Sequence, residues 1–148
     1  MRLTGLIVLG ALVAACSPAG KAGEEDKAAP ATAATPTVAD FAGTWNGEAV
    51  IEGTPNPVKS VVTLGADGSG SMTLDGRPAI PLTVSMSGDS LIAESAEYES
   101  VLRPGVMVTT RTAQVLVDGM MKGNMVAIYK TPNGPTEVKG TWSSTKAP

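Results

Sequence analysis

The sequence contains no histidine, only one cysteine and few aromatic residues, which make up 3% of its 148 positions. Without imidazole, the Ser-His-Asp and Cys-His catalytic arrangements and the commonest type of zinc site are excluded. A single cysteine cannot form a disulfide within the chain, so packing alone must stabilise the fold. We therefore expect no enzymatic activity, no catalytic residues, no metal and no other cofactor.

Clustered positive charge is also missing. The chain has 11 basic and 14 acidic residues, which gives a net charge of −3 at pH 7. The lysines of residues 41–148 are scattered over predicted strands and turns, at Lys59, Lys122, Lys130, Lys139 and Lys146. Binding to nucleic acid needs basic side chains gathered against the phosphate backbone. The sequence therefore predicts no nucleic-acid partner.

The longest apolar stretch, residues 6–13, is far shorter than the roughly 20 residues that span a membrane. It follows Arg2 and precedes small residues, which is the layout of a secretory signal. The segment Val13-Ala14-Ala15-Cys16 resembles the lipobox of bacterial lipoproteins. The resemblance implies that lipoprotein signal peptidase cuts before Cys16, which is acylated on its sulfur. The alternative is an ordinary secretory signal cut at an alanine, with Cys16 a free thiol or removed.

Lipidation of Cys16 would anchor the protein to a membrane through its acyl chains. Each buried methylene contributes about 0.8 kcal/mol, so the two or three chains of a bacterial lipoprotein hold it stably. In that family an aspartate after the cysteine often retains the protein in the inner membrane, and Ser17 at this position favours the outer membrane, with the protein facing the periplasm. After the signal peptide 1–15, residues 16–40 are rich in Ala, Pro and Thr and are predicted to form a disordered tether.

Residues 41–148 are predicted to form one all-β domain. Apolar and polar side chains alternate with the period of two that is typical of half-buried strands, and glycine-containing turn signals separate the segments. Eight strands are predicted, over residues 44–52, 58–64, 72–74, 80–86, 91–95, 106–117, 121–129 and 138–144. Segment 106–117 carries apolar side chains on both faces, which favours a bulge that exchanges the faces.

Eight sequential strands joined by tight turns predict an eight-stranded antiparallel meander. Closure into a barrel removes the exposed edges that would template aggregation, whereas the alternative is an open sandwich. In a closed meander the first and last strands can pair antiparallel, and Gly43-Thr44-Trp45 is echoed by Gly140-Thr141-Trp142. We therefore expect Trp45 and Trp142 to be buried and near one another.

The segment Phe41-Ala42-Gly43-Thr44-Trp45 opens the first predicted strand. It resembles the Gly-x-Trp start of lipocalin and avidin-type barrels, which together are called calycins. The resemblance implies a small barrel with a lumen. The chain departs from the lipocalin pattern in having no C-terminal helix and no disulfide, and it lacks the additional tryptophans with which avidin-type barrels enclose biotin.

The predicted inward face carries many small residues, which leaves space for one small ligand in an eight-stranded barrel. The candidate lumen residues are Trp45, Met86, Arg111, Met125, Tyr129 and Trp142. Arg111 would pair with a ligand carboxylate if it points inward, and an outward, solvated arginine is the alternative. A barrel that large side chains fill completely is also compatible with the pattern.

Two functions remain open at this point. The first is a cell-envelope carrier or chaperone for a small apolar or amphipathic ligand in the lumen. The second is an envelope protein-interaction module, such as a protease inhibitor or an assembly accessory, with a filled barrel that acts through its rim, tether or outer face. A continuous lumen that opens to solvent would distinguish them.

Three further groups of residues are interpreted as structural. The segment 67–70 resembles the middle of a calcium loop, but glycines occupy the first and last ligand positions of that loop, so a hairpin turn is predicted. Met120 lies on the opposite face from its neighbours Met121 and Met125, which favours core packing over a copper site. The glutamates of segment 94–99 lack the aromatic platform that would favour a glycosidase carboxylate pair.

Overall fold

The computed structural model describes residues 34–148. The predicted signal peptide, the predicted lipidation site Cys16 and most of the predicted tether lie outside the described residues. Within residues 34–148, no helix has both the length and the apolar composition needed to cross a membrane.

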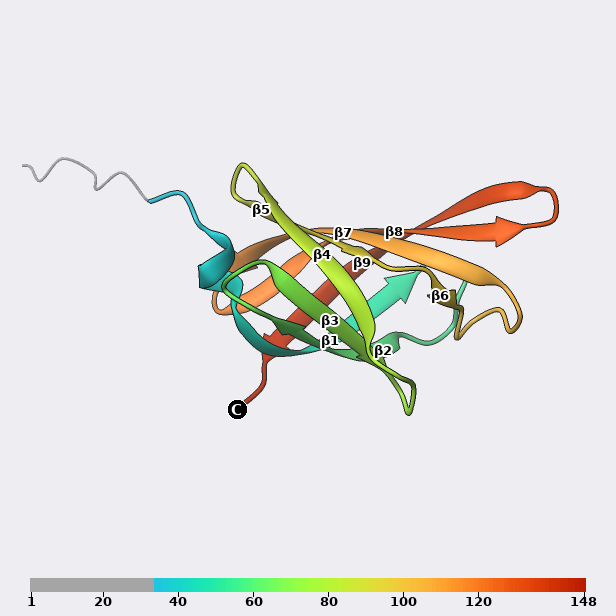
Figure 1. Ribbon diagram of the computed structural model, residues 1–148, viewed down its shortest axis with the longest axis horizontal. Helices are drawn as coiled ribbons and strands as arrows, with labels where there is room; N and C mark the ends of the chain where they lie inside the picture. Colours follow the sequence, from blue (N-terminus) through green and yellow to red (C-terminus); the bar gives the residue numbers. More distant parts are fainter. Residues whose placement is uncertain (1–33) are drawn as a thin grey trace, which may run out of the picture. The chain divides into compact units, whose positions relative to one another are not determined.

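Nine β-strands and one short 3-10 helix make up the described part of the chain (Figure 1). In chain order they are η1 (Val38–Phe41), β1 (Gly43–Ile51), β2 (Val58–Leu64), β3 (Ser69–Leu74), β4 (Ile80–Ser87), β5 (Ser90–Ser95), β6 (Tyr98–Glu99), β7 (Met107–Val117), β8 (Met120–Thr131) and β9 (Gly134–Lys146). Each predicted strand corresponds to one of these. The two-residue strand β6 has no counterpart in the prediction, and it pairs with β7, the strand that also pairs with β5.

The strands close into an antiparallel barrel. Strands that follow one another along the chain pair with one another, except that β5 and the short β6 both pair with β7. The pairing of β1 with β9 completes the ring. Alternate residues of β1 and β2 are buried, as the period of two predicts. The closed meander is therefore confirmed, and the open sandwich is wrong.

The register between β1 and β9 separates the two tryptophans. Trp45 lies opposite Lys146, whereas Trp142 lies opposite Ala49. Since a strand rises about 3.4 Å per residue, the Cα atoms of the two tryptophans lie on levels about 14 Å apart along the barrel wall. The Trp142 ring, however, reaches Gly47, which is two residues from Trp45 on β1. Both are buried, as predicted. Antiparallel pairing places the two Gly-Thr-Trp segments toward opposite ends of β1, but the Trp142 indole extends back toward Trp45, so the expectation that the two rings lie close together stays a prediction.

The bulge predicted for segment 106–117 is not found in β7. That strand pairs with β8 in unbroken register from Val108 to Val117. The irregularity lies on the other side of β7, where residues 95–97, from the last residue of β5 to the start of β6, face only residues 109 and 110. The Ser95 hydroxyl fills the gap in the ladder by accepting a hydrogen bond from the Thr110 N–H, at 2.8 Å. Apolar residues occur on both faces of β7 because its outer face exposes some of them to solvent.

Helix η1 covers the end of the barrel at which β1 begins, here called the closed end (Figure 1). Phe41 is completely buried, and the indole N–H of Trp45 donates to its carbonyl oxygen at 2.8 Å. The Lys146 ammonium lies 5.4 Å from the centre of the Trp45 ring. Helix η1 begins at Val38, which packs against the core, so the last residues of the predicted tether contribute to the fold.

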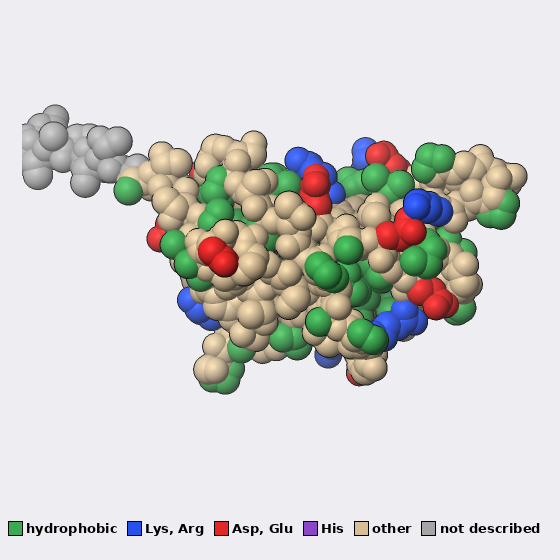
Figure 2. Space-filling view, viewed as in Figure 1, with side chains coloured by type: hydrophobic (Ala, Val, Ile, Leu, Met, Phe, Trp, Pro, Cys, Tyr) green, Lys and Arg blue, Asp and Glu red, His purple; other side chains and the backbone are tan. Residues whose placement is uncertain are grey.

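The opposite end of the barrel, here called the mouth, carries the loop between β6 and β7 and the hairpin of β8 and β9 (Figure 1). This hairpin projects beyond the neighbouring strands. Its turn is held by the Thr131 hydroxyl, which donates to the Gly134 carbonyl at 2.6 Å. On the face that Figure 2 shows, acidic and basic side chains are interspersed with uncharged ones.

Candidate ligand site in the barrel lumen

The barrel encloses an elongated cavity between its core and the mouth. The cavity has a volume of about 50 Å³, and most of the side chains around it are aliphatic or aromatic. They include Ala49, Ile51, Val58, Val62, Leu74, Ala93, Val108, Met125, Ala127 and Tyr129. The lumen is therefore neither wide open nor completely filled by side chains.

Three of the predicted lumen residues line this cavity, namely Met125, Tyr129 and Trp142. Trp45 and Met86 do not. Trp45 belongs to the closed end beside Phe41, and Met86 lies near the end of β4, where it is half-buried against the same core. The predicted site residues therefore fall into two groups. Met125, Tyr129 and Trp142 line the cavity, whereas Trp45 and Met86 pack in the core outside it.

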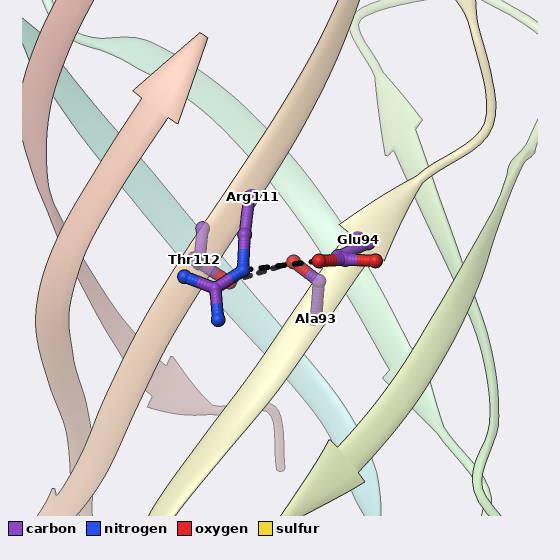
Figure 3. Close-up of polar contacts among 4 residues, drawn as sticks. All are labelled: Ala93, Glu94, Arg111 and Thr112. Atoms are coloured by element: carbon purple, nitrogen blue, oxygen red, sulfur yellow. Dashed lines mark hydrogen bonds and ion pairs between the residues drawn. The ribbon is translucent and has the colours of Figure 1, made fainter. Parts of the chain in front are cut away.

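Arg111 does not point into the lumen, so its assignment to the ligand site is wrong. Its Nε donates to Glu94 Oε1 at 3.0 Å across the outer face of β5 and β7, and its side chain is 54% exposed. Figure 3 shows this pair, together with the hydrogen bond of the neighbouring Thr112 hydroxyl to the Ala93 carbonyl, at 3.4 Å. Because side chains alternate along a strand, Thr112 faces inward and Arg111 outward.

The indole of Trp142 is the largest side chain that borders the cavity, and glycine makes space for it. A Cβ atom at Gly47 would overlap the six-membered ring of Trp142. Gly123, which lies opposite Trp142 on β8, is equally confined, since a Cβ there would overlap the backbone of Ala113. Gly47 therefore leaves the space that the indole occupies, whereas at Gly123 the close approach is to the backbone of β7.

A ring of polar side chains interrupts the apolar lumen near this indole. We call it the inner polar belt, and it consists of Ser60, Thr112, Gln114, Trp142 and Ser144, of which all but Ser144 border the cavity. The Gln114 amide donates to the Thr112 hydroxyl at 2.7 Å. Ser60 and Ser144 both lie opposite Gly47, on either side of β1.

Several polar atoms of the belt lack hydrogen-bond partners among the described residues. They are Ser60 Oγ, Gln114 Oε1, Trp142 Nε1 and Ser144 Oγ. Leaving a buried polar group without a partner costs about 1–3 kcal/mol. Buried polar atoms are normally satisfied by protein, water or a bound molecule. The belt is therefore the part of the lumen best suited to bind something polar.

The mouth is covered by the loop of residues 100–106, here called the mouth loop, which contributes Ser100, Val101 and Leu102 to the cavity lining. The buried hydroxyl of Ser100 accepts hydrogen bonds from the N–H groups of Leu102 and Arg103, both at 3.1 Å. The Gly105 N–H donates to Glu99 Oε1 at 2.8 Å. The loop is held by its own local contacts and forms a compact cover.

Two tyrosines lie beneath the mouth loop. The Arg103 guanidinium lies 4.3 Å from the centre of the Tyr129 ring, a cation–π contact between the loop and β8. Tyr98 also borders the cavity, and burial raises the pKa of its hydroxyl, although a hydrogen bond with Thr110 acts in the opposite direction. Both rings thus form part of the apolar wall at the mouth.

Sequence reasoning missed Ser60 and Gln114 as site residues, and it missed the mouth loop. Ser60 is one of the small residues on the inward face of β2, and small size alone does not indicate a binding role. Gln114 could have been found from the even-numbered positions of β7, since Val108, Thr110 and Thr112 share its face. The hydrogen bonds of Ser100 have no signal in the sequence, because they depend on how the loop folds.

The other groups of residues have structural surroundings. Asp67 Oδ1 accepts hydrogen bonds from the backbone and side chain of Ser69, which forms a turn. Met121 and Met125 are buried while Met120 lies on the opposite face. Each glutamate of segment 94–99 has a different partner, namely Arg111, Lys130 and the Gly105 N–H. Among residues 34–148, no group of three acidic, cysteine or histidine residues is placed to hold a metal ion.

No protein-family model matches the chain, and no curated protein matches it. Two solved structures show weak similarity to it. The bradavidin2–biotin complex is 17% identical with a TM-score of 0.45, and the match covers 68% of this chain and 95% of that chain. The rhizavidin–biotin complex is 11% identical with a TM-score of 0.45, and the match covers 71% of this chain and 98% of that chain. At this level of similarity nothing follows for a ligand of this chain, and the barrel assignment rests on the strand pairing.

Proposed function

We propose that this protein is a lipid-anchored binding protein of the cell envelope, whose barrel lumen holds one small apolar or amphipathic molecule. The observation that carries the proposal is the apolar lumen with buried polar atoms left without partners. A role in binding, without catalysis, fits a cavity lined mainly by aliphatic and aromatic side chains. The cavity volume of about 50 Å³ is below the roughly 300–1,000 Å³ of ordinary small-molecule sites. A larger ligand therefore requires the mouth loop to move.

An apolar fluorescent probe tests the lumen directly. We expect uncharged N-phenyl-1-naphthylamine to quench tryptophan emission, because Trp142 borders the cavity. Trp142→Phe should lose most of this effect, whereas Trp45→Phe should keep it, since Trp45 belongs to the closed end. Quenching that is unchanged in Trp142→Phe, or absent in the parent protein, would contradict lumen binding.

The membrane anchor is proposed from the lipobox resemblance at Cys16, and Ser17 supports an outer-membrane location facing the periplasm. In cells fed a radioactive fatty acid, the parent protein should be labelled and Cys16→Ala should not. Labelling that persists in Cys16→Ala would contradict the anchor. Density fractionation that places the protein in the inner membrane would contradict only the location.

The second candidate function is a protein-interaction module of the envelope, such as a protease inhibitor or an assembly accessory. The small cavity and the projecting β8–β9 hairpin favour it. This function predicts no response to the apolar probe. It also predicts loss of a specific partner when the hairpin turn, residues 132–133, is replaced by an unrelated turn of equal length.

A further inference from the structure

Three polar atoms border the lumen cavity without a hydrogen-bond partner among the described residues. They are Ser60 Oγ on β2, Gln114 Oε1 on β7 and Trp142 Nε1 on β9, and each side chain is more than nine-tenths buried. The strands that carry them lie on different sides of the barrel. Hydrogen-bonding groups from three strands thus border one largely apolar cavity.

The chemistry of these atoms limits what they can bind. An indole N–H only donates, an amide oxygen only accepts, and a hydroxyl can do either. A molecule that satisfies both Trp142 and Gln114 must therefore present at least one acceptor and one donor.

The lining of the cavity also limits the charge of the bound group. None of the described residues that line it is Asp, Glu, Lys or Arg. A charged group buried there would have no counter-ion, and burial of an unpaired charge is strongly unfavourable. The buried part of the molecule is therefore uncharged.

We infer that the inner polar belt recognises an uncharged group with both a donor and an acceptor, such as an alcohol or a carboxamide, on a molecule whose apolar remainder points toward the mouth. This inference rests on the proposed lumen-binding function and specifies its ligand class. The apolar remainder would lie against Tyr98, Val101 and Leu102, which line the cavity at the mouth. A cavity of about 50 Å³ has space for a hydroxyl or a carboxamide group, because one water molecule needs only about 10–15 Å³.

A set of four-carbon and five-carbon probes tests the inference on the ¹⁵N-labelled full chain. Butanamide and 1-butanol carry a donor and an acceptor, 2-pentanone carries only an acceptor, and pentane carries neither. Butanoate and butylammonium test charge. We expect butanamide and 1-butanol to bind at least tenfold more tightly than the two ions, and to shift the indole N–H resonance of Trp142. The Trp45 indole resonance is the internal control, because this N–H already donates to Phe41.

Two variants identify the belt as the recognition element. Gln114→Leu should weaken butanamide binding about three- to tenfold while pentane binding is kept or improved, since one hydrogen bond of typical strength is lost. Ser60→Ala is a smaller change that should also weaken butanamide binding, and it replaces Gln114→Leu as the test variant if that protein does not fold. Thr109→Val lies on β7 outside the cavity lining and should leave binding of every probe unchanged.

The outcomes separate this inference from the function on which it rests. If pentane and 2-pentanone bind but butanamide binds no better than butanoate, or leaves the Trp142 resonance unmoved, the inference is overturned and lumen binding stands. If the belt holds only ordered water, no probe shifts the Trp142 resonance, which also overturns the inference. If no probe binds at all, the proposed lumen function is itself overturned.

Discussion

At the scale of single residues, the lumen depends on where glycine replaces a side chain. Gly47 lies between Ser60 and Ser144 in the sheet, and its missing side chain leaves the space that the Trp142 ring occupies. We expect Gly47→Ala to destabilise the fold by about 1–3 kcal/mol, because an added methyl overpacks a filled site. Asn46→Ala, on the exposed face of the same strand, should change stability by less than about 0.5 kcal/mol. Denaturant unfolding measures both, and equal stability of the two variants would contradict the packing.

The two tryptophans stabilise different ends of the same core. Truncation of either to alanine should cost about 3–5 kcal/mol, the range for a large aromatic side chain removed from a core. Trp45→Ala should also loosen η1, because the indole N–H bonds to the Phe41 carbonyl. Thermal melts give the cost, and hydrogen exchange of residues 38–42 gives the loosening. A Trp45→Ala protein that melts like the parent would contradict the account of the closed end.

We expect the carboxyl of Asp40, at the closed end, to make the stability of the fold depend on pH. Asp40 accepts hydrogen bonds from the backbone N–H of Thr37, at 2.7 Å, and from its hydroxyl, at 2.9 Å, and these lower the pKa of the carboxyl below 3.8. A lowered folded-state pKa stabilises the fold above the unfolded pKa, and this contribution is lost as the pH falls through the folded value. Asp40→Asn should therefore lower the Tm at pH 7 and converge with the parent in strong acid. A difference that is constant with pH would exclude the carboxylate as its cause.

At the scale of elements, the mouth loop is the part of the barrel that local hydrogen bonds hold in place. Ser100→Ala removes the acceptor for the N–H groups of Leu102 and Arg103. We expect faster hydrogen exchange of these two amides and faster binding of an apolar probe, with little change in exchange within β1 and β9. Exchange that is unchanged at Leu102 and Arg103 would show that the Ser100 hydroxyl does not hold the loop.

The strands and their inward faces were predictable from the sequence where buried and exposed residues alternate strictly, and they were less predictable in β7, where the alternation is irregular. In β1 and β2 one face is buried and the other exposed, so the period of two gives both the strands and their inward sides. In β7 the outer face carries exposed Val117, which resembles a change of face and led to the bulge prediction. The polar belt was not predicted, because the bulge expected in segment 106–117 left the inward side of Gln114 undetermined. Arg111 was assigned to the lumen because its ion-pair partner Glu94 lies on another strand, and sequence alone does not show which strands are neighbours.

At the scale of the whole molecule, the chain forms a closed barrel whose lumen is incompletely filled by side chains. Closure follows from the pairing of β1 with β9 and of β5 with β7. The lumen follows from small inward residues such as Ala49, Ala93 and Ala127, which line the cavity and leave part of its space unfilled. The proposed anchor at Cys16 and the proposed ligand in the lumen would make this barrel a binding protein held at a membrane surface.

Native mass spectrometry of the full-length protein, purified from its own cell envelope without denaturation, tests this claim most directly. The account predicts a polypeptide with the added mass of acyl chains and one non-covalently bound uncharged small molecule per barrel. The small molecule should be lost on unfolding and retained less by the Gln114→Leu variant. An acylated protein that carries no small molecule, or that retains only a protein partner, would contradict the claim that the lumen is a ligand site.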